Sequence, residues 1–219
     1  MRTATNRSRR RVLVLTGALV LLGLADWASV AAGQGAVPPV GLMNGMADSV
    51  TAAVKADPSL LNASGRVSPR FLDMSEERVM PYIYFSEMTA LATGRHWRDA
   101  TPDQQRQLTS HFRELILSTD GVQLCRLLAT PGRYESPAFH TGDDDAEVFF
   151  HSADRPQAVQ AEYRLELTLA GWKMMDMQLG GTWMVESYKQ LFAQQIARVG
   201  IDGLIKYLAD RNKAISNRP

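Results

Sequence analysis

The sequence predicts an α+β fold in which several helices cover one antiparallel sheet of about four strands. Three observations support this. Apolar residues recur at helical spacing through most of residues 42–128, they alternate with polar residues from Gln160 to Leu169, and helical spacing returns from Val185 onward. Helices first, strands next and helices last is an α+β order. A sheet with its apolar face beneath helices is a natural place for an apolar cavity.

The first half of the chain is predicted to be helical. Apolar residues at steps of four predict a helix from Leu42 to Ala56, which ends at Asp57-Pro58 because a residue before proline disfavours helical backbone. Two shorter helices are expected over residues 71–80 and 83–93, separated by Pro81. In the second of these, Phe85, Met88 and Leu91 are expected on the inner side.

A stronger helix start lies at Thr101-Pro102-Asp103-Gln104. The Thr101 hydroxyl can cap the helix, Pro102 suits the first helical position, and Gln104 can complete a capping box. This helix is expected to end at Asp120-Gly121, and another short helix is expected over residues 122–128. Its buried stripe is formed by Leu108, Phe112, Leu115 and Ile116.

Strands are expected after Pro131. Residues 147–151 form a short strand, and the alternation from Gln160 to Leu169 predicts a second, joined by an Ala170-Gly171 turn to a return strand over residues 172–179. That turn would place Leu167 opposite Met174 and Leu165 opposite Asp176. We therefore expect the face from Leu165 to Leu169 to be buried near the turn, with a cavity opening near Asp176.

The last part of the chain returns to a helix with one apolar face. After the Gly180-Gly181 break, an apolar stripe from Val185 to Val199 has helical spacing. Gly200 interrupts it, and a short helical segment over residues 201–208 follows. The block contains no recurring acid–base group, which favours a hydrophobic container over an active site.

The N-terminus has the form of a secretion signal. A basic leader precedes an apolar run of 13 residues from Val12 to Leu24, and small residues then allow cleavage after Ala32. Thirteen residues are too few to span a bilayer as a helix, which needs about 20. We therefore expect residues 1–32 to be a signal peptide and residues 33–219 to form a single domain outside the cytoplasm, as a monomer.

The charge of the remaining chain argues against nucleic acid as a partner. Removing the leader's five arginines and one aspartate from 24 basic and 23 acidic residues leaves 19 and 22, a net charge of −3. Phosphate backbones require a basic surplus or stripe, which is not indicated here. No cofactor is expected.

Candidate catalytic and metal-binding groups are sparse. No Gly-x-Ser-x-Gly motif, zinc-type Cys/His spacing or EF-hand pattern occurs, and His111 with Glu114 offers at most a weak pair. Cys125 is the only cysteine, and its position between leucines favours a small buried hydrophobe over a nucleophile. We expect no metal site and no catalytic residue. A lipid-modifying enzyme that uses Cys125 or a histidine remains the alternative class.

Several motifs in the second half resemble one known family, the MlaC-like periplasmic phospholipid carriers, also called the toluene-tolerance family. The matching residues are Trp172, Lys173 and Asp176 in the return strand, then Tyr188, Lys189 and Phe192, then the Gly200–Ile205 segment, and earlier the stretch from Met88 to Ile116. The resemblance covers roughly Val79 to Asn212. Trp183 departs from the pattern, since a small residue is usual there.

The resemblance implies a carrier that shuttles phospholipid between the outer and inner membranes and maintains lipid asymmetry of the outer membrane. Its implied partners are an inner-membrane ABC transporter complex and an outer-membrane lipoprotein. Lys189, Arg164 and Arg198 are candidates for lipid phosphate or partner charges. The candidate lipid-binding residues are apolar and aromatic: Phe85, Met88, Leu91, Trp97, Phe112, Leu115, Phe149, Tyr163, Leu165, Leu167, Trp172, Met174, Tyr188 and Phe192.

Two alternatives stay open beside the phospholipid carrier. A related branch of the family is linked to hopanoids, so the ligand could be a polycyclic lipid, and Trp183 could reshape the cavity for it. The same apolar residues also fit an interaction module with a fully packed core and no cavity. Methionines near core positions suit either reading, because methionine adapts to ligands of varying shape and also fills ordinary cores.

Overall fold

The computed structural model describes residues 37–61 and 67–217. The signal peptide expected over residues 1–32 lies outside these residues. The helices are α1 (Pro39–Ala56), α2 (Pro69–Arg78), α3 (Phe85–Thr93), α4 (Pro102–Thr119), α5 (Gly121–Leu128) and α6 (Met184–Ser216), with short 3₁₀ turns at Pro58–Leu61, Met80–Tyr82 and Gly94–Trp97. None of these helices has the length and apolar content needed to cross a membrane.

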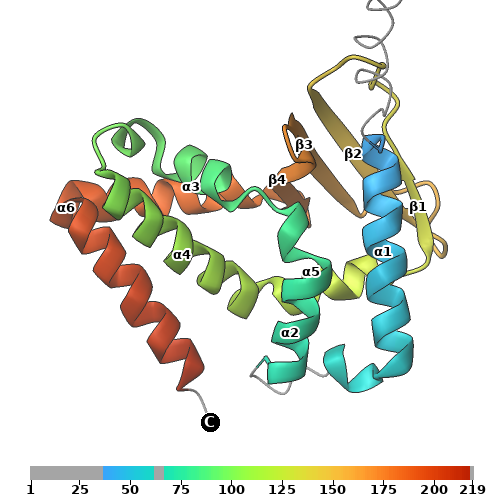
Figure 1. The fold of residues 1–219 in the computed structure, drawn as a ribbon, viewed down its shortest axis with the longest axis horizontal. Coiled ribbons are helices and arrows are strands. Elements are labelled where there is room, and N and C mark those ends of the chain that lie inside the picture. Colours follow the sequence, from blue (N-terminus) through green and yellow to red (C-terminus); the bar gives the residue numbers. More distant parts are fainter. Residues whose placement is uncertain (1–36, 62–66, 218–219) are drawn as a thin grey trace, which may run out of the picture. The chain divides into compact units, whose positions relative to one another are not determined.

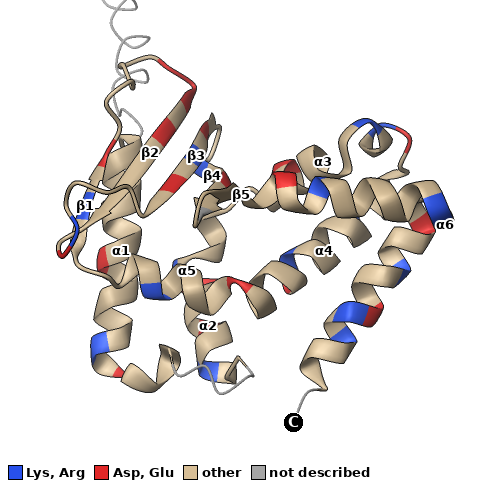
Figure 2. Ribbon diagram, turned by 180° about the vertical axis from the view of Figure 1, so that it is seen from behind, with Lys and Arg blue, Asp and Glu red and all other residues tan. Residues whose placement is uncertain are grey.

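Within the described residues, an antiparallel sheet of five strands has the order β1-β2-β3-β4-β5, as expected for an α+β fold; strands β1 to β4 are labelled in Figure 1. The strands are β1 (Gly132–Glu135), β2 (Asp145–Ser152), β3 (Ala161–Thr168), β4 (Gly171–Leu179) and β5 (Thr182–Trp183). Helix α1 packs against β1 and β2, while α3 and α6 pack against β4. Charged positions lie along β2 and β3, where acidic residues are prominent (Figure 2).

Local sequence signals account for the helix ends. The Thr101 hydroxyl accepts a hydrogen bond from the Gln104 backbone N–H at 3.2 Å, and the Gln104 side chain accepts one from the Thr101 N–H at 2.9 Å, which is the predicted capping box of α4. At Gly200 the backbone leaves the helical region (φ 73°, ψ −176°), so α6 is two helical segments joined at a kink. Glycine adopts this left-handed φ without steric cost.

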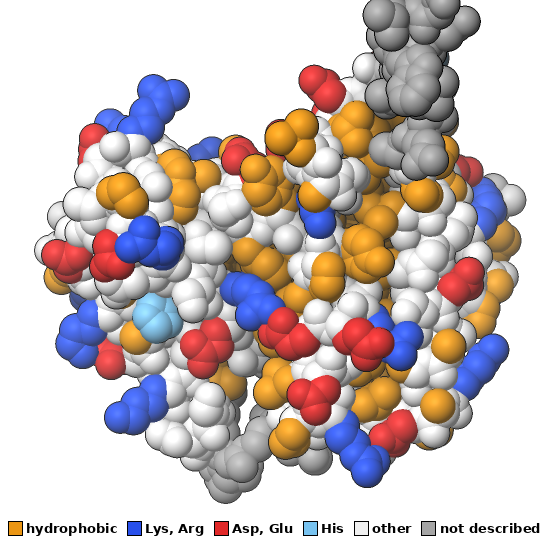
Figure 3. All heavy atoms as spheres, in the orientation of Figure 1, with side chains coloured by type: hydrophobic (Ala, Val, Ile, Leu, Met, Phe, Trp, Pro, Cys, Tyr) orange, Lys and Arg blue, Asp and Glu red, His pale blue; other side chains and the backbone are white. Residues whose placement is uncertain are grey.

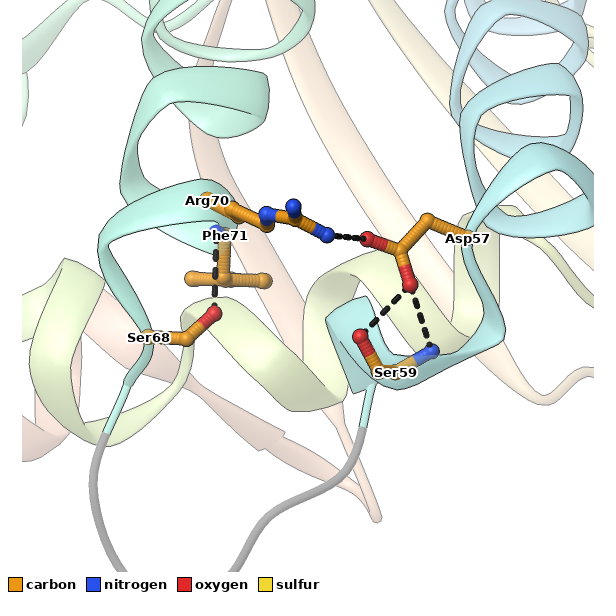
Figure 4. A network of polar contacts seen from close by, with 5 residues as sticks. All are labelled: Asp57, Ser59, Ser68, Arg70 and Phe71. Atoms are coloured by element: carbon orange, nitrogen blue, oxygen red, sulfur yellow. Dashed lines mark hydrogen bonds and ion pairs between the residues drawn. The ribbon is translucent and has the colours of Figure 1, made fainter.

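The ends of α1 and α2 are joined by polar contacts (Figure 4). Asp57 accepts hydrogen bonds from the backbone N–H and hydroxyl of Ser59, at 3.1 and 2.5 Å, and pairs with Arg70 at 3.0 Å. The Ser68 hydroxyl accepts from the Phe71 N–H at 3.1 Å and caps α2. These contacts link the end of α1 to the start of α2, although Arg70 is too exposed for the ion pair itself to add much stability.

The β3–β4 register differs from the prediction. Leu167 pairs with Trp172 and Leu165 with Met174, and a bulge beside Leu165 then brings Arg164 opposite Asp176. The turn residues are Leu169 and Ala170, because Thr168 pairs with Gly171 and its hydroxyl donates to the Gly171 carbonyl at 2.7 Å. The prediction of burial near the turn was wrong: Leu169 is fully exposed and Leu167 is 38% exposed.

Candidate functional site

Two adjoining surface cavities form a groove beside β3 and β4, and both include Arg164 and Met175 in their walls. We call them together the Arg164 groove. The larger, about 640 Å³, is lined by Ala138, Phe139, Asp143, Asp145, Ala146, Glu147, Arg164, Leu165 and Met175. The smaller, about 350 Å³, is lined by Leu91, Arg164, Met175, Asp176, Trp183, Val185, Glu186 and Lys189. The groove therefore runs from the β1–β2 loop to the start of α6.

Arg164 is held in the groove by two neighbours. Its Nε atom lies 3.2 Å from Glu147 Oε1, and its guanidinium carbon lies 3.8 Å from the centre of the Trp183 ring. Stacking on an aromatic ring and pairing with a carboxylate both favour a defined guanidinium position. The side chain remains partly exposed, so it can also meet an anionic group that enters the groove. Trp183, which departs from the family pattern, thus forms a support for this cation.

Asp176 joins the sheet to the start of α6. Its Oδ1 atom accepts hydrogen bonds from the backbone N–H groups of Met177 at 2.9 Å and Val185 at 3.0 Å. Burial raises the pKa of this carboxyl, and the two backbone N–H groups oppose that rise. By accepting from Val185, Asp176 satisfies a backbone N–H group in the first turn of α6, where the helix dipole favours negative charge. The groove opens beside Asp176, where the sequence predicted a cavity mouth.

A second cation, Lys189, lines the groove from α6 with its Nζ atom 3.4 Å from Glu186 Oε2. Arg198, the third candidate for an anionic group, instead donates to Gln195 at 2.8 Å and is not among the groove-lining residues. The groove thus combines apolar side chains with two cations and five carboxylates: Asp143, Asp145, Glu147, Asp176 and Glu186.

The fourteen apolar and aromatic candidates separate into three groups in the structure. The buried ones are Phe85, Met88, Phe112, Leu115, Tyr163, Leu165, Trp172, Met174 and Phe192. Trp97, Phe149 and Tyr188 are half-buried. Leu91, expected on the inner side of its helix, is instead 39% exposed and lines the groove, and Leu167 is exposed beside the turn.

Most of the buried candidates pack against one another. Phe112 of α4 contacts Tyr188 and Phe192 of α6 edge-on, with ring centroids 4.8 and 5.1 Å apart. On the face shown in Figure 3, hydrophobic side chains gather in the hollowed middle of the surface and charged side chains border them.

Cys125 and His111, two of the groups considered for catalysis, are not among the residues that line the groove. Cys125 is buried in α5, its Sγ atom lies 4.0 Å from Ser75 Oγ, and burial raises the pKa of the thiol to about 11. A thiol with this pKa is protonated at neutral pH and is a poor nucleophile. His111 Nδ1 lies 3.9 Å from Glu114 Oε2. Over residues 37–61 and 67–217, no cluster of three His, Cys, Asp or Glu side chains could hold a metal ion.

Comparison with known proteins decides the family. The family described as MlaC protein matches residues 45–210, most of the chain. The chain belongs to the MlaC family. The matched residues include Met88 to Ile116 and Trp172 to Asp210, which contain the motifs that carried the resemblance.

A solved structure is also similar to this chain. The chain is similar to the phospholipid-binding protein from Ralstonia solanacearum, which was solved in complex with a phospholipid. The two are 27% identical, the TM-score is 0.68, and the likeness covers 81% of this chain and 98% of the other. No functionally curated protein matches this chain.

Several groove residues of this MlaC protein were not predicted from sequence. Phe139 and Ala138 lie in the β1–β2 connection, and Met175 lies at the bulge of β4. No periodic pattern marks them, because loops and bulges interrupt the alternation on which strand prediction depends. The one sequence signal for the groove was Asp176, a charged residue on a predicted strand face that was otherwise apolar.

Proposed function

We propose that this protein is a periplasmic phospholipid carrier that encloses acyl chains between its sheet and its helices. The observation that carries the proposal is family membership over residues 45–210 together with a lipid-bound structural neighbour covering 98% of its own chain. Both point to a binding protein rather than an enzyme. The buried candidates, from Phe85 to Phe192, would form the walls against the tails.

The energetics of the ligand explain why a carrier is needed. Moving one methylene out of water is favourable by about 0.8 kcal/mol, so two tails with roughly thirty methylenes would cost on the order of 25 kcal/mol to expose. Release therefore requires a partner that opens the protein or takes up the tails directly. We propose the partners that the family implies, an inner-membrane ABC transporter complex and an outer-membrane lipoprotein.

The Arg164 groove is the proposed mouth of the site. A lipid phosphate placed there would meet Arg164 and Lys189, while Leu91, Leu165 and Met175 would contact the first methylenes. Each cation already has one carboxylate neighbour, Glu147 or Glu186, so its interaction with a phosphate would be moderate. Low headgroup specificity is the expected consequence.

The cellular route is also part of the proposal. We propose that residues 1–32 direct export and are removed after Ala32, leaving residues 33–219 as one domain. The sequence of the leader and the family of the remaining chain support this. N-terminal sequencing of the exported protein tests the cleavage position directly.

The test of ligand class is organic extraction of the purified protein followed by mass spectrometry. Stoichiometric phospholipid is the expected result. Polycyclic species would move the assignment to the alternative ligand, and an extract that stays empty after incubation with phospholipid vesicles would contradict the carrier function. Met175→Glu, on the groove wall, should lower the lipid recovered, and Leu169→Glu, at the exposed turn, is its matched control.

A further inference from the structure

A further cavity of about 520 Å³ lies where α3 and the turn that follows it pack against α6, and we call it the Arg95 pocket. Figure 1 shows α3 beside α6 in this part of the fold. The walls of the pocket combine three basic side chains with small and apolar ones, including Arg95, His96, Lys189, Ala193, Ile196 and Ala197. Because Lys189 also lines the Arg164 groove, the pocket adjoins the groove.

Two local features shape the pocket. Gly94 has a φ of 62°, a left-handed conformation that glycine adopts without steric cost, and the 3₁₀ turn that begins there carries Arg95. On α6, Lys189, Ala193 and Ala197 are four residues apart, so they share one face of the helix. Because the two alanine side chains are short, they leave space between this face and the turn.

The charge of the Arg95 pocket differs from that of the Arg164 groove. The groove walls contain five carboxylates with two cations, whereas no carboxylate among the described residues lines the Arg95 pocket. His96 Nδ1 lies 3.9 Å from Asp99 Oδ2 and Lys189 Nζ lies 3.4 Å from Glu186 Oε2, but Arg95 takes part in no ion pair within the part of the chain that the structure describes. A hollow lined by one sign of charge and by apolar walls concentrates the electric field, so this pocket attracts anions.

The donors of the pocket fit a phosphate group. A guanidinium presents its N–H groups in a planar fork that can bind two phosphate oxygens at once, and an ammonium adds a compact charge beside it. Since Arg95 is exposed and has no carboxylate partner, a phosphate does not have to displace one. A phosphate carried by a lipid headgroup would also bring apolar surface against Ala193 and Ile196, which a free phosphate ion would not.

We propose that the Arg95 pocket is a phosphate-binding site, separate from the Arg164 groove, for the headgroup phosphate of a phospholipid at a membrane surface or for a free phosphate ion. The two sources share one chemistry, and the experiments below separate them. The inference goes beyond the proposed carrier function, because this site needs no lipid in the interior. A membrane headgroup bound here would hold the neighbouring groove close to the bilayer with which lipid is exchanged.

The first test titrates inorganic phosphate into the purified protein and follows the backbone amide signals by NMR, with chloride keeping the ionic strength constant. The amide signals of Arg95, His96 and Ala193 should shift together and saturate with a dissociation constant in the millimolar range, as expected for a few charge-assisted hydrogen bonds in water. Arg95→Gln should weaken this binding about tenfold. Signals that do not shift, or that shift without saturating, would overturn the inference.

The matched control removes a positive charge elsewhere. Lys55, at the end of α1, is exposed, takes part in no ion pair among the described residues and lies far along the chain from the pocket. Lys55→Gln should leave the phosphate titration unchanged. If Lys55→Gln and Arg95→Gln weaken phosphate binding equally, the effect is one of net charge and the site is contradicted.

The second test identifies the source of the phosphate by co-sedimentation with vesicles. Vesicles of phosphatidylcholine alone are compared with vesicles in which phosphatidylglycerol replaces part of the phosphatidylcholine. Stronger binding to the phosphatidylglycerol vesicles, reduced about fivefold by Arg95→Gln and not by Lys55→Gln, would support a lipid headgroup as the source. Amide shifts with phosphate but no binding to either kind of vesicle would support the site with free phosphate as its ligand.

Stability and lipid extraction separate this inference from other roles. Arg95→Gln should leave the midpoint of urea unfolding unchanged, because the side chain is exposed and has no ion pair among the described residues. A lowered midpoint with phosphate binding retained would mean that Arg95 only stabilises the end of α3, which contradicts the site. An empty lipid extract with the amide shifts present contradicts the carrier function alone, and stoichiometric phospholipid without the shifts contradicts this inference alone.

Discussion

The contact between α4 and α6 and the Arg164 groove both contain large apolar side chains, yet they differ in structure. Phe112 of α4 contacts Tyr188 and Phe192 of α6 edge-on, whereas Leu91 and Met175 line the groove beside Arg164. An apolar stripe therefore indicates burial or binding equally well. What distinguishes the groove is the presence of charges held at its edge by specific neighbours.

The first prediction has the largest expected effect and tests the contact between α4 and α6. Phe112→Ala should destabilise the protein by about 3–5 kcal/mol, because it removes a completely buried ring and leaves a cavity between α4 and α6. Leu91→Ala, in the groove, should cost less than about 1 kcal/mol. Urea unfolding of the delipidated proteins measures both. Equal losses would mean that Leu91 belongs to the same packed interior as Phe112.

The second prediction concerns Asp176, which lies where the groove meets the core. Asp176→Ala should destabilise by about 2 kcal/mol, because two buried backbone N–H groups, of Met177 and Val185, lose their acceptor. Asp176→Asn can retain an oxygen acceptor and should cost less. Urea unfolding again gives the difference. If both substitutions cost the same, then the carboxylate charge rather than the acceptor oxygen stabilises the start of α6.

The same carboxyl predicts a pH dependence. Since burial raises the folded-state pKa of Asp176 above its unfolded value, the native state binds this proton more tightly than the unfolded state does. The stability that Asp176 contributes should therefore increase as the pH falls through the folded pKa, and it is lost as the pH rises through it. The difference in unfolding free energy between wild type and Asp176→Asn, followed from about pH 7 to about pH 4, should shift in favour of wild type. A shift towards the variant would contradict a raised pKa.

Local signals predicted the fold well, and contacts between distant elements could not be predicted in the same way. The capping box at Thr101 and the interruption at Gly200 depend on a few neighbouring residues, so they can be recognised directly in the sequence. The five-strand sheet was expected with about four strands, because β1 and β5 are too short to show alternation. The β3–β4 register was predicted wrongly because the Thr168 side chain moves the turn by one residue.

The groove could not be predicted from the sequence, because its residues come close together only in the folded chain. Arg164 was singled out from sequence as a phosphate candidate, but its stacking on Trp183 joins a strand residue to one just before α6. No period in the sequence relates these positions. The bulge beside Leu165, which turns Arg164 towards Asp176, has no simple sequence signal either.

The third prediction tests the groove as a binding surface. Arg164→Gln and Lys189→Gln should each reduce phospholipid affinity several-fold, in line with the loss of one hydrogen bond to a charged group, and should leave stability within about 0.5 kcal/mol. Arg198→Gln is the matched control, since Arg198 does not line the groove. Lipid exchange from vesicles gives the affinities. A loss in the control equal to that in the groove variants would indicate a general charge effect.

The smallest expected effect is the reactivity of Cys125, a probe of the closed interior. With its pKa raised to about 11 by burial, the native thiol should not react with an aqueous thiol reagent until the protein unfolds. A cysteine introduced by Met175→Cys in a Cys125→Ala background should react readily, because the groove is open to solvent, and bound phospholipid should slow that reaction. Reagent kinetics with and without lipid measure both. Fast labelling of native Cys125 would mean that the interior opens to solvent without a ligand. The interior and the Arg164 groove would then differ only in how fast each is exposed to solvent.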